Sequence, residues 1–297
     1  MKKSWSMIGC MLLLGFSTSS AMAEDSDWTI KADLQGEYGS YNKSIKRDSI
    51  TNAGIIIAAD YLDQGGFSLA VNSTTVKYKL APTINQQSYF ASVRYNLHVD
   101  GLPGKLMLRL DGHYISNNDV TGNSDGVKII APQLAFMNYA KNFYMDIGFA
   151  HSSYKNNLTI NQYTPTLGFG FNDLADWAQL RAYLIDTSNP LRAQNKSKTA
   201  GAELKWTHWF APSNSLHLYK LQAGILAGER IFAVDGDAAA VYNLADVQRG
   251  SASLGLTWNL TDTTHLMVLA GEERYLDNTI ANSYSSRFVY IDLSTQW

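Results

Sequence analysis

Hydrophobic and polar residues alternate along the chain from residue 28 to residue 297. The first segment shows the pattern most clearly, because Ile30, Ala32 and Leu34 share one parity while Lys31 and Asp33 share the other. Successive residues of a β-strand point to opposite faces of the sheet. The alternation therefore predicts a sheet that is apolar on one face and charged on the other.

We predict about fourteen strands of this kind, and twelve to sixteen fit the pattern equally well. Each segment is near or above the roughly 9–11 residues that a tilted strand needs to cross a bilayer. The predicted strands are Trp28–Tyr38, Ile50–Tyr61, Phe67–Tyr78, Gln87–His98, Lys105–Ser116, Val127–Tyr139, Phe143–Tyr154, Leu158–Phe171, Trp177–Asp186, Ser197–Phe210, Leu216–Ala233, Val247–Leu260, His265–Tyr275 and Ser285–Trp297.

Short and long connections alternate between these strands. The compact turns are Leu62–Gly66, Val99–Gly104, Ala140–Asn142, Asn172–Asp176, Ala211–Ser215 and Thr261–Thr264. The connections between them are Gly39–Ser49, Lys79–Gln86, Asn117–Gly126, the short exception Lys155–Asn157, Thr187–Lys196, Val234–Asp246 and Leu276–Tyr284. Outer-membrane barrels have tight periplasmic turns and longer extracellular loops. The alternation of short and long connections predicts that both termini are periplasmic. This placement requires an even number of strands.

The first residues have the three parts of a secretory signal peptide. A positive start at Met1–Lys3 precedes an apolar stretch, Met7–Phe16, and a small-residue site at Ala21–Ala23. We expect residues 1–23 to be removed and residues 24–297 to form the mature barrel. Acylation at Cys10 is the alternative, but the apolar stretch continues past this residue. Since Cys10 is the only cysteine, the mature chain is expected to have no thiol and no disulfide.

Composition narrows the class of protein. Charged residues make up 17% of the chain and its net charge is −2, so no basic excess points to nucleic acid. The longest apolar run in the predicted mature chain, Ala53–Ala59, is far shorter than the roughly 20 residues of a spanning helix. Without such a helix, only a closed barrel satisfies every backbone group in lipid. We therefore predict an all-β, transmembrane, antiparallel up-and-down β-barrel.

The end of the chain resembles the C-terminal signature of bacterial outer-membrane β-barrel proteins. Trp297 stands where phenylalanine is usual, and Val289, Ile291 and Leu293 occupy alternate positions before it, whereas Thr295 departs from the pattern. The resemblance is at superfamily level and covers the mature chain as an architecture. It implies the outer membrane of a Gram-negative bacterium, contact with outer-membrane lipid and lipopolysaccharide, and recognition by the outer-membrane insertion machinery.

The charges on the predicted inner face are mixed in sign, which suits a hydrated lumen because buried charges without water are costly. We expect a monomer-capable, porin-like channel for passive diffusion of small hydrophilic solutes. Alternatively, the charges pair and close the lumen, which gives a structural or assembly barrel with a partner in an envelope or secretion complex. The connection Val234–Asp246 can fold inward, so the sequence does not determine the radius of the pore. The predicted pore-lining residues are Lys31, Asp33, Glu37, Arg94, Arg109, Asp111, His113, Arg181, Glu203 and Lys205.

A lipid esterase is the third hypothesis. His151 and Ser153 share the outward parity of one strand, and this pair resembles the catalytic pair of outer-membrane phospholipase A and of lipid A deacylases. The resemblance implies that His151 is the base and Ser153 the nucleophile. Asn161 has the outward parity on the next strand, but it is closer in sequence than those families place the third residue. A polar strand end among the lipid head groups explains the same residues, so the sequence favours the channel.

Two further patterns have weaker support. Asp111 and His113 resemble one half of the omptin protease site, but the acidic residues Asp235 and Asp237 lie in a predicted loop. One acid–base pair without partners is not a site.

The sequence has no phosphate-binding glycine loop, haem motif or Cys/His cluster, so we expect no cofactor and no metal. We place Pro132 and Pro165 near the starts of two predicted strands, where proline is tolerated. The alternative is that these prolines shape the mouth of the barrel.

Overall fold

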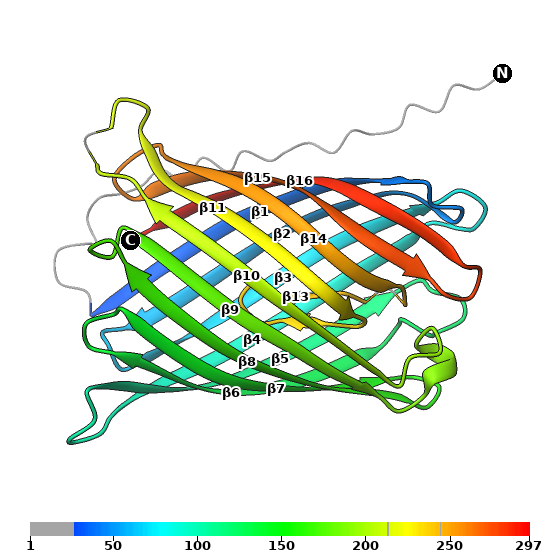
Figure 1. Cartoon of the computed structure of the whole chain (residues 1–297), viewed down its shortest axis with the longest axis horizontal. Helices are drawn as coiled ribbons and strands as arrows, with labels where there is room; N and C mark the ends of the chain where they lie inside the picture. The colour runs from blue at the N-terminus through cyan, green and yellow to red at the C-terminus, as the bar shows by residue number, and fades with distance from the viewer. Residues whose placement is uncertain (1–26, 213, 244) are drawn as a thin grey trace.

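The chain forms a closed antiparallel barrel of 14 strands in a computed structural model, which describes residues 27–212, 214–243 and 245–297 (Figure 1). This confirms the predicted fold. The predicted signal peptide, with Cys10, lies outside the described residues. No helix within the described ranges has the length and hydropathy to span a bilayer. The barrel strands are β1 (Trp28–Asn42), β2 (Arg47–Tyr61), β3 (Gly65–Tyr78), β4 (Ile84–His98), β5 (Gly104–Asn117), β6 (Val127–Asn138), β7 (Phe143–Tyr154), β8 (Leu158–Phe171), β9 (Asp176–Thr187), β10 (Lys198–Trp209), β11 (Leu218–Arg230), β14 (Val247–Asn259), β15 (Thr264–Asp277) and β16 (Asn282–Gln296).

The alternation of the sequence becomes the two faces of the barrel wall. On β1, Leu34 and Tyr38 are 51% and 56% exposed, whereas Asp33 is only 8% exposed. The same difference recurs around the barrel, and large apolar side chains cover its outer surface. An apolar exterior with a polar interior is the arrangement that lipid outside and water inside require.

The barrel closes through its first and last strands. Lys31 is the register partner of Gln296. The N–H of Trp297 donates to the carbonyl of Ile30 over 2.9 Å, and the N–H of Ile30 donates back over 3.0 Å. The C-terminus and the start of β1 lie together at one end of the barrel (Figure 1). Closure leaves no unpaired sheet edge in contact with lipid.

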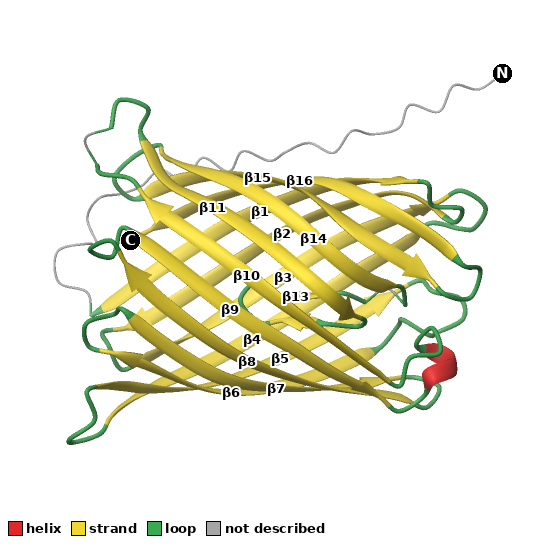
Figure 2. Cartoon of the chain, in the orientation of Figure 1, coloured by secondary structure: helices red, strands yellow, loops and turns green. Residues whose placement is uncertain are grey.

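Several strands extend beyond their predicted bounds at the end opposite the termini. The predicted loop Gly39–Ser49 shrinks to residues 43–46, and Leu276–Tyr284 shrinks to residues 278–281. The ends of these strands are polar, but they continue the ladder of backbone hydrogen bonds between neighbouring strands. Ser40 and Arg287 are such a pair of register partners. The longest connections, 118–126, 188–197 and 231–246, all join strands at this end of the barrel, where η1 (Pro190–Arg192) lies in red in Figure 2.

Two sequence interpretations were wrong in detail. The predicted strand Leu216–Ala233 ends at Arg230 instead, because the next residues turn into the lumen. Pro132 and Pro165 do not lie near strand starts but within β6 and β8. Proline has no N–H for the ladder, and the pairing of β6 with β7 is interrupted at Pro132.

Candidate pore and its constriction

The predicted pore-lining residues all lie at inward-facing register positions. Paired residues of a ladder point to the same side of the sheet. The register joins Arg94 to Arg109 and Arg181 to Glu203, on the face opposite the exposed apolar residues. These positions agree with the predicted parity, and the role of each side chain in selectivity stays a prediction.

A hairpin occupies part of the lumen. Residues 231–246 connect β11 to β14 and contain two short paired strands, β12 (Val234–Asp235) and β13 (Ala240–Val241). Figure 1 shows β13 inside the barrel wall. We call residues 231–246 the lumenal hairpin. The hairpin shows that the connection predicted at Val234–Asp246 folds inward, which the sequence had left undetermined.

Apolar packing holds the first part of the lumenal hairpin. Phe232 is 4% exposed and Val234 is 5% exposed, although both lie within a barrel with a largely polar interior. The inner wall beside them is apolar, so the two surfaces exclude water from each other. The wall residues in this cluster include Ile115, Val127, Ile129, Leu158, Ile160, Tyr183 and Ile185.

The amide of Gln162 clamps the backbone of the hairpin. Its Nε2 donates to the carbonyl of Val234 over 2.7 Å, and its Oε1 accepts from the N–H of Val234 over 3.0 Å. Gln162 is 2% exposed. One side chain on β8 therefore satisfies both backbone groups of a buried residue, which would be costly to leave unpaired.

Ion pairs hold the tip of the hairpin against the wall. Arg181 contacts Asp235 at 3.3 Å and Asp237 at 2.5 Å. Lys205 lies 3.9 Å from Asp235. Arg109 donates to the carbonyl of Gly236 over 2.6 Å. Burial raises the pKa of Asp235, a residue of the lumenal hairpin and not of a spanning strand, but Lys205, Arg181 and Arg230 outweigh burial and lower the pKa to about 2.

The second part of the hairpin reaches the opposite wall. Asp246 forms an ion pair with Arg47 of β2 at 2.6 Å. Asn243 donates to the side chain of Gln86 on β4 over 2.9 Å. The Arg230 guanidinium lies over the ring of Tyr242, 4.2 Å from its centroid, and such a stack is favourable. The hairpin therefore crosses the bore and narrows it.

Free space is distributed unevenly around the hairpin. A space of only about 40 Å³ remains between its tip and the β5–β9 wall, beside Arg109 and Asp111. A cavity of about 640 Å³ lies on the other side, where Glu37, Asn52 and Tyr242 are among the lining residues. Most of the free space beside the hairpin therefore lies along the β1–β4 wall.

Most of the predicted residues can be grouped by what they contact. Arg109, Asp111, Arg181, Glu203 and Lys205 surround the hairpin tip or the residues that hold it. Lys31, Asp33 and Arg94 have ion-pair partners elsewhere, because Lys31 pairs with Asp33 at 2.9 Å and Arg94 pairs with Asp60. Glu37 lines the large cavity.

Sequence reasoning missed the anchoring roles of Gln162, Arg230 and Arg47. The available signal was a run of apolar residues at inward parity on β5, β6, β8 and β9, in a wall that is otherwise polar. Such a patch requires a segment of chain to cover it inside the barrel.

Asp111 and His113 do not form an acid–base site with Asp235 and Asp237 of the hairpin. Arg109 holds Asp111 at 2.8 Å, and Arg181 holds both Asp235 and Asp237. His113 is 6% exposed and packs on the ring of Phe90, with 4.9 Å between the ring centroids. The three aspartates therefore act as ion-pair partners of arginine in this structure.

His151 and Ser153 lie on the outer surface, as their parity predicted. His151 and Asn161 are register partners, and His151 Nδ1 lies 2.7 Å from Asn161 Oδ1, which is hydrogen-bond distance. The spacing in sequence was no obstacle, because β7 and β8 are joined by the tight turn 155–157. No hydrogen bond joins Ser153 to His151 among the described contacts.

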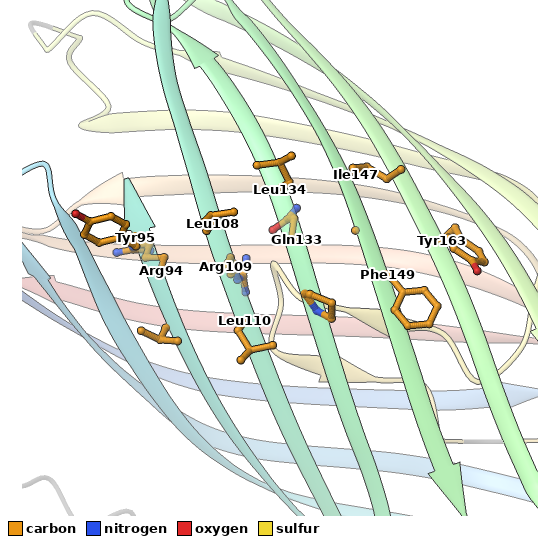
Figure 3. A pocket seen from close by; sticks show the side chains of 13 residues that line it. Arg94, Tyr95, Leu108, Arg109, Leu110, Gln133, Leu134, Ile147, Phe149 and Tyr163 are labelled. Atoms are coloured by element: carbon orange, nitrogen blue, oxygen red, sulfur yellow. The ribbon is translucent and has the colours of Figure 1, made fainter. Parts of the chain in front are cut away.

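An apolar hollow adjoins this pair on the lipid-facing surface. It has a volume of about 520 Å³ and crosses β4 to β8 (Figure 3). Leu110, Leu134 and Phe149 line it, with Pro132 at the interrupted ladder. Phe149 is the register partner of Tyr163, one pair along the outward face from His151 and Asn161. The outward side chains that line the hollow, such as Leu110, Leu134 and Phe149, are apolar.

Several solved structures have a similar fold. Omp33 of Acinetobacter baumannii is 9% identical, with a TM-score of 0.49 and coverage of 91% of this chain and 99% of that one. This similarity concerns the β-barrel fold alone. OprB of Pseudomonas putida is 7% identical (TM-score 0.47; 91% and 94% covered), and the KdgM porin, solved with disordered oligogalacturonate, is 10% identical (0.42; 89% and 98%). No protein-family model and no curated protein sequence matches the chain. At these identities the neighbours' solutes say nothing about the solute of this chain.

Proposed function

We propose that this chain is an outer-membrane channel for passive diffusion of small hydrophilic solutes, and that the lumenal hairpin forms its constriction. The observation that carries the proposal is the cavity of about 640 Å³ between the hairpin and the β1–β4 wall. Charged and polar side chains line this cavity, including Glu37, Arg47 and Asp246. A hydrated path of mixed charge favours small polar solutes over apolar ones.

Single-channel recording of the refolded mature protein in planar bilayers tests the proposal. Discrete, salt-dependent openings are the expected result. Arg94→Gln should shift the ion selectivity away from anions, because it removes a cation from the inner wall. A folded barrel that never conducts would contradict the proposal and favour the alternative, a structural barrel of an envelope or secretion complex.

We also propose that both termini face the periplasm, since the longest connections leave the barrel at the other end. The predicted mature chain contains no cysteine, so single cysteines report topology cleanly. Val120→Cys, in connection 118–126, should react with an impermeant maleimide on intact cells. Asp100→Cys, in turn 99–103, should react only after the cells are broken. The reverse pattern would overturn the orientation.

A second candidate function is hydrolysis of lipid esters at the outer surface. It rests on the 2.7 Å contact between His151 and Asn161 and on the apolar hollow beside them. In this proposal Ser153 Oγ attacks the ester carbonyl while His151 takes its proton, and the alkoxide leaves with that proton. Water then releases the acyl group from Ser153, again with His151 as base. Asn161 orients the imidazole.

Phospholipid hydrolysis by the refolded protein tests this second function. Ser153→Ala should abolish turnover, and Asn161→Ala should reduce it while leaving the barrel folded. Ser152→Ala, on the inward face of the same strand, is the matched control. Absence of hydrolysis by the unmodified protein would exclude the esterase and leave the channel proposal untouched.

A further inference from the structure

A basic groove of about 530 Å³ lies on the outer surface at the end of the barrel opposite the termini. It crosses β14, β15 and β16 and reaches the connection after β1. Four cations line it, Lys43, Arg249, Arg274 and Arg287, and Glu272 is the carboxylate among the lining residues. Four positive charges and one negative charge give the groove a formal charge of +3.

The register places Arg274 and Arg287 on the lipid-facing side of the wall, and Arg249 lies beside them at the bulge of β14. Arg274 pairs with Ser285, and Glu272 pairs with Arg287. Their chain neighbours Tyr275 and Tyr284 point inward and are 7% and 5% exposed. The side chain of Arg287 is 71% exposed and that of Arg249 is 53% exposed. The guanidinium groups are therefore directed toward the membrane and not toward the pore.

The protein neutralises this charge only in part. Arg287 forms an ion pair with Glu272 at 2.9 Å, and Arg249 lies 3.6 Å from Glu229. Arg274 and the side chain of Lys43 have no hydrogen-bond or ion-pair partner among the residues that the structure describes. An unpaired arginine on a lipid-facing wall is costly unless an anion from the surroundings meets it.

Apolar side chains continue from the groove toward the middle of the barrel. On the outward face of β16, Arg287 is followed by Val289, Ile291 and Leu293, which are 45%, 48% and 37% exposed. On β14 the outward Leu254 is 57% exposed. A cationic rim above an apolar band matches a lipid with an anionic head group and acyl chains.

We propose that this groove binds the phosphate groups of lipid A, the membrane anchor of lipopolysaccharide, through Arg249, Arg274 and Arg287, with Lys43 beside them. Arginine suits this ligand because its planar fork donates two parallel hydrogen bonds to one phosphate. The acyl chains lie along Val289 and Ile291. The inference is independent of pore conduction, but it rests on the proposed orientation, in which this end faces the outside.

Binding of lipid A to the refolded mature protein in detergent tests the site. The triple variant Arg249→Gln, Arg274→Gln, Arg287→Gln should raise the Kd for bisphosphorylated lipid A at least about tenfold, because three charge-assisted contacts are lost. Arg274→Gln alone should raise it about threefold, at roughly 0.7 kcal/mol for one exposed charge contact. Lys128→Gln is the matched control, because Lys128 is an exposed, outward cation on β6, opposite β15 in the strand order.

Three results would overturn the proposal. They are an unchanged Kd for the triple variant, an equal loss for Lys128→Gln, and equal affinity of the wild type for lipid A without phosphates or for phosphatidylglycerol. Heat-dependent gel mobility reports folding of each variant. If the triple variant does not fold, Arg274→Gln decides, because its side chain has no partner to lose within the described residues. An unchanged single-channel conductance in that variant separates lipid binding from the channel function.

Discussion

Arg181→Met is expected to release the tip of the lumenal hairpin while the barrel stays closed. Arg181 is the ion-pair partner of both Asp235 and Asp237, and its side chain is 7% exposed. Removing one partner of a buried pair costs about 3–5 kcal/mol, because the other charge stays buried. Lys205 remains 3.9 Å from Asp235, so we expect the lower end of this range.

A cost of about 3 kcal/mol raises the population of hairpins with a detached tip roughly 100-fold, at about 1.4 kcal/mol for each factor of ten. The base of the hairpin should stay in place, since Phe232 and Val234 keep their apolar contacts. Single-channel recordings should therefore show a further open level, or longer openings, beside the level of the wild type.

Arg94→Met is the matched control. It removes the same charge from the inner wall, but Arg94 pairs with Asp60 and does not contact the hairpin. It should change ion selectivity without adding an open level. If Arg181→Met keeps the open levels and dwell times of the wild type, the hairpin is not the element that limits conduction.

Three further predictions concern the same hairpin. Phe232→Ala should lower the stability by about 3–5 kcal/mol through the cavity it leaves, seen as a lower guanidinium midpoint in tryptophan fluorescence; an unchanged midpoint would contradict the apolar anchor. Gln162→Leu leaves the N–H and carbonyl of Val234 unpaired, at about 1–3 kcal/mol each, so amide exchange at the hairpin should accelerate while the barrel strands stay protected. Since the pKa of Asp235 is lowered to about 2, its charge stabilises the hairpin fully above about pH 4, and this contribution is lost as the pH falls toward 2. Openings recorded from pH 8 to pH 2.5 should therefore increase only below about pH 4, and an increase between pH 8 and pH 5 would count against this assignment.

Much of the wall was predictable because its pattern is local. Parity alone assigned Asp33 and Arg181 to the inner face and His151 to the outer face, since a strand has only two faces. The strand ends were predicted less well. Ser40 and Arg287 are polar, yet they continue the ladder, because backbone hydrogen bonds do not require apolar side chains.

The lumenal hairpin was only partly predictable, because its contacts are remote in sequence. Ile231 and Phe232 are apolar and follow β11 directly, so the sequence pattern places them in that strand. Their partners Ile115 and Ile160 lie on β5 and β8, and only the closed barrel brings these strands around the hairpin. Hydrogen bonds such as that between Gln162 and Val234 likewise have no local sequence signature.

In the proposed channel, the lumenal hairpin separates two requirements, which are insertion into lipid and the width of the bore. Insertion into lipid depends on the outward residues of the strands, whereas the width of the bore depends largely on residues 231–246. Asp237 has a side chain that is 44% exposed and lies near the tip, so substitutions there alter the passage without touching the lipid surface. In the proposed channel, mutations in this one short segment can therefore change the width of the bore, which makes the hairpin a suitable place to redesign the barrel for another solute.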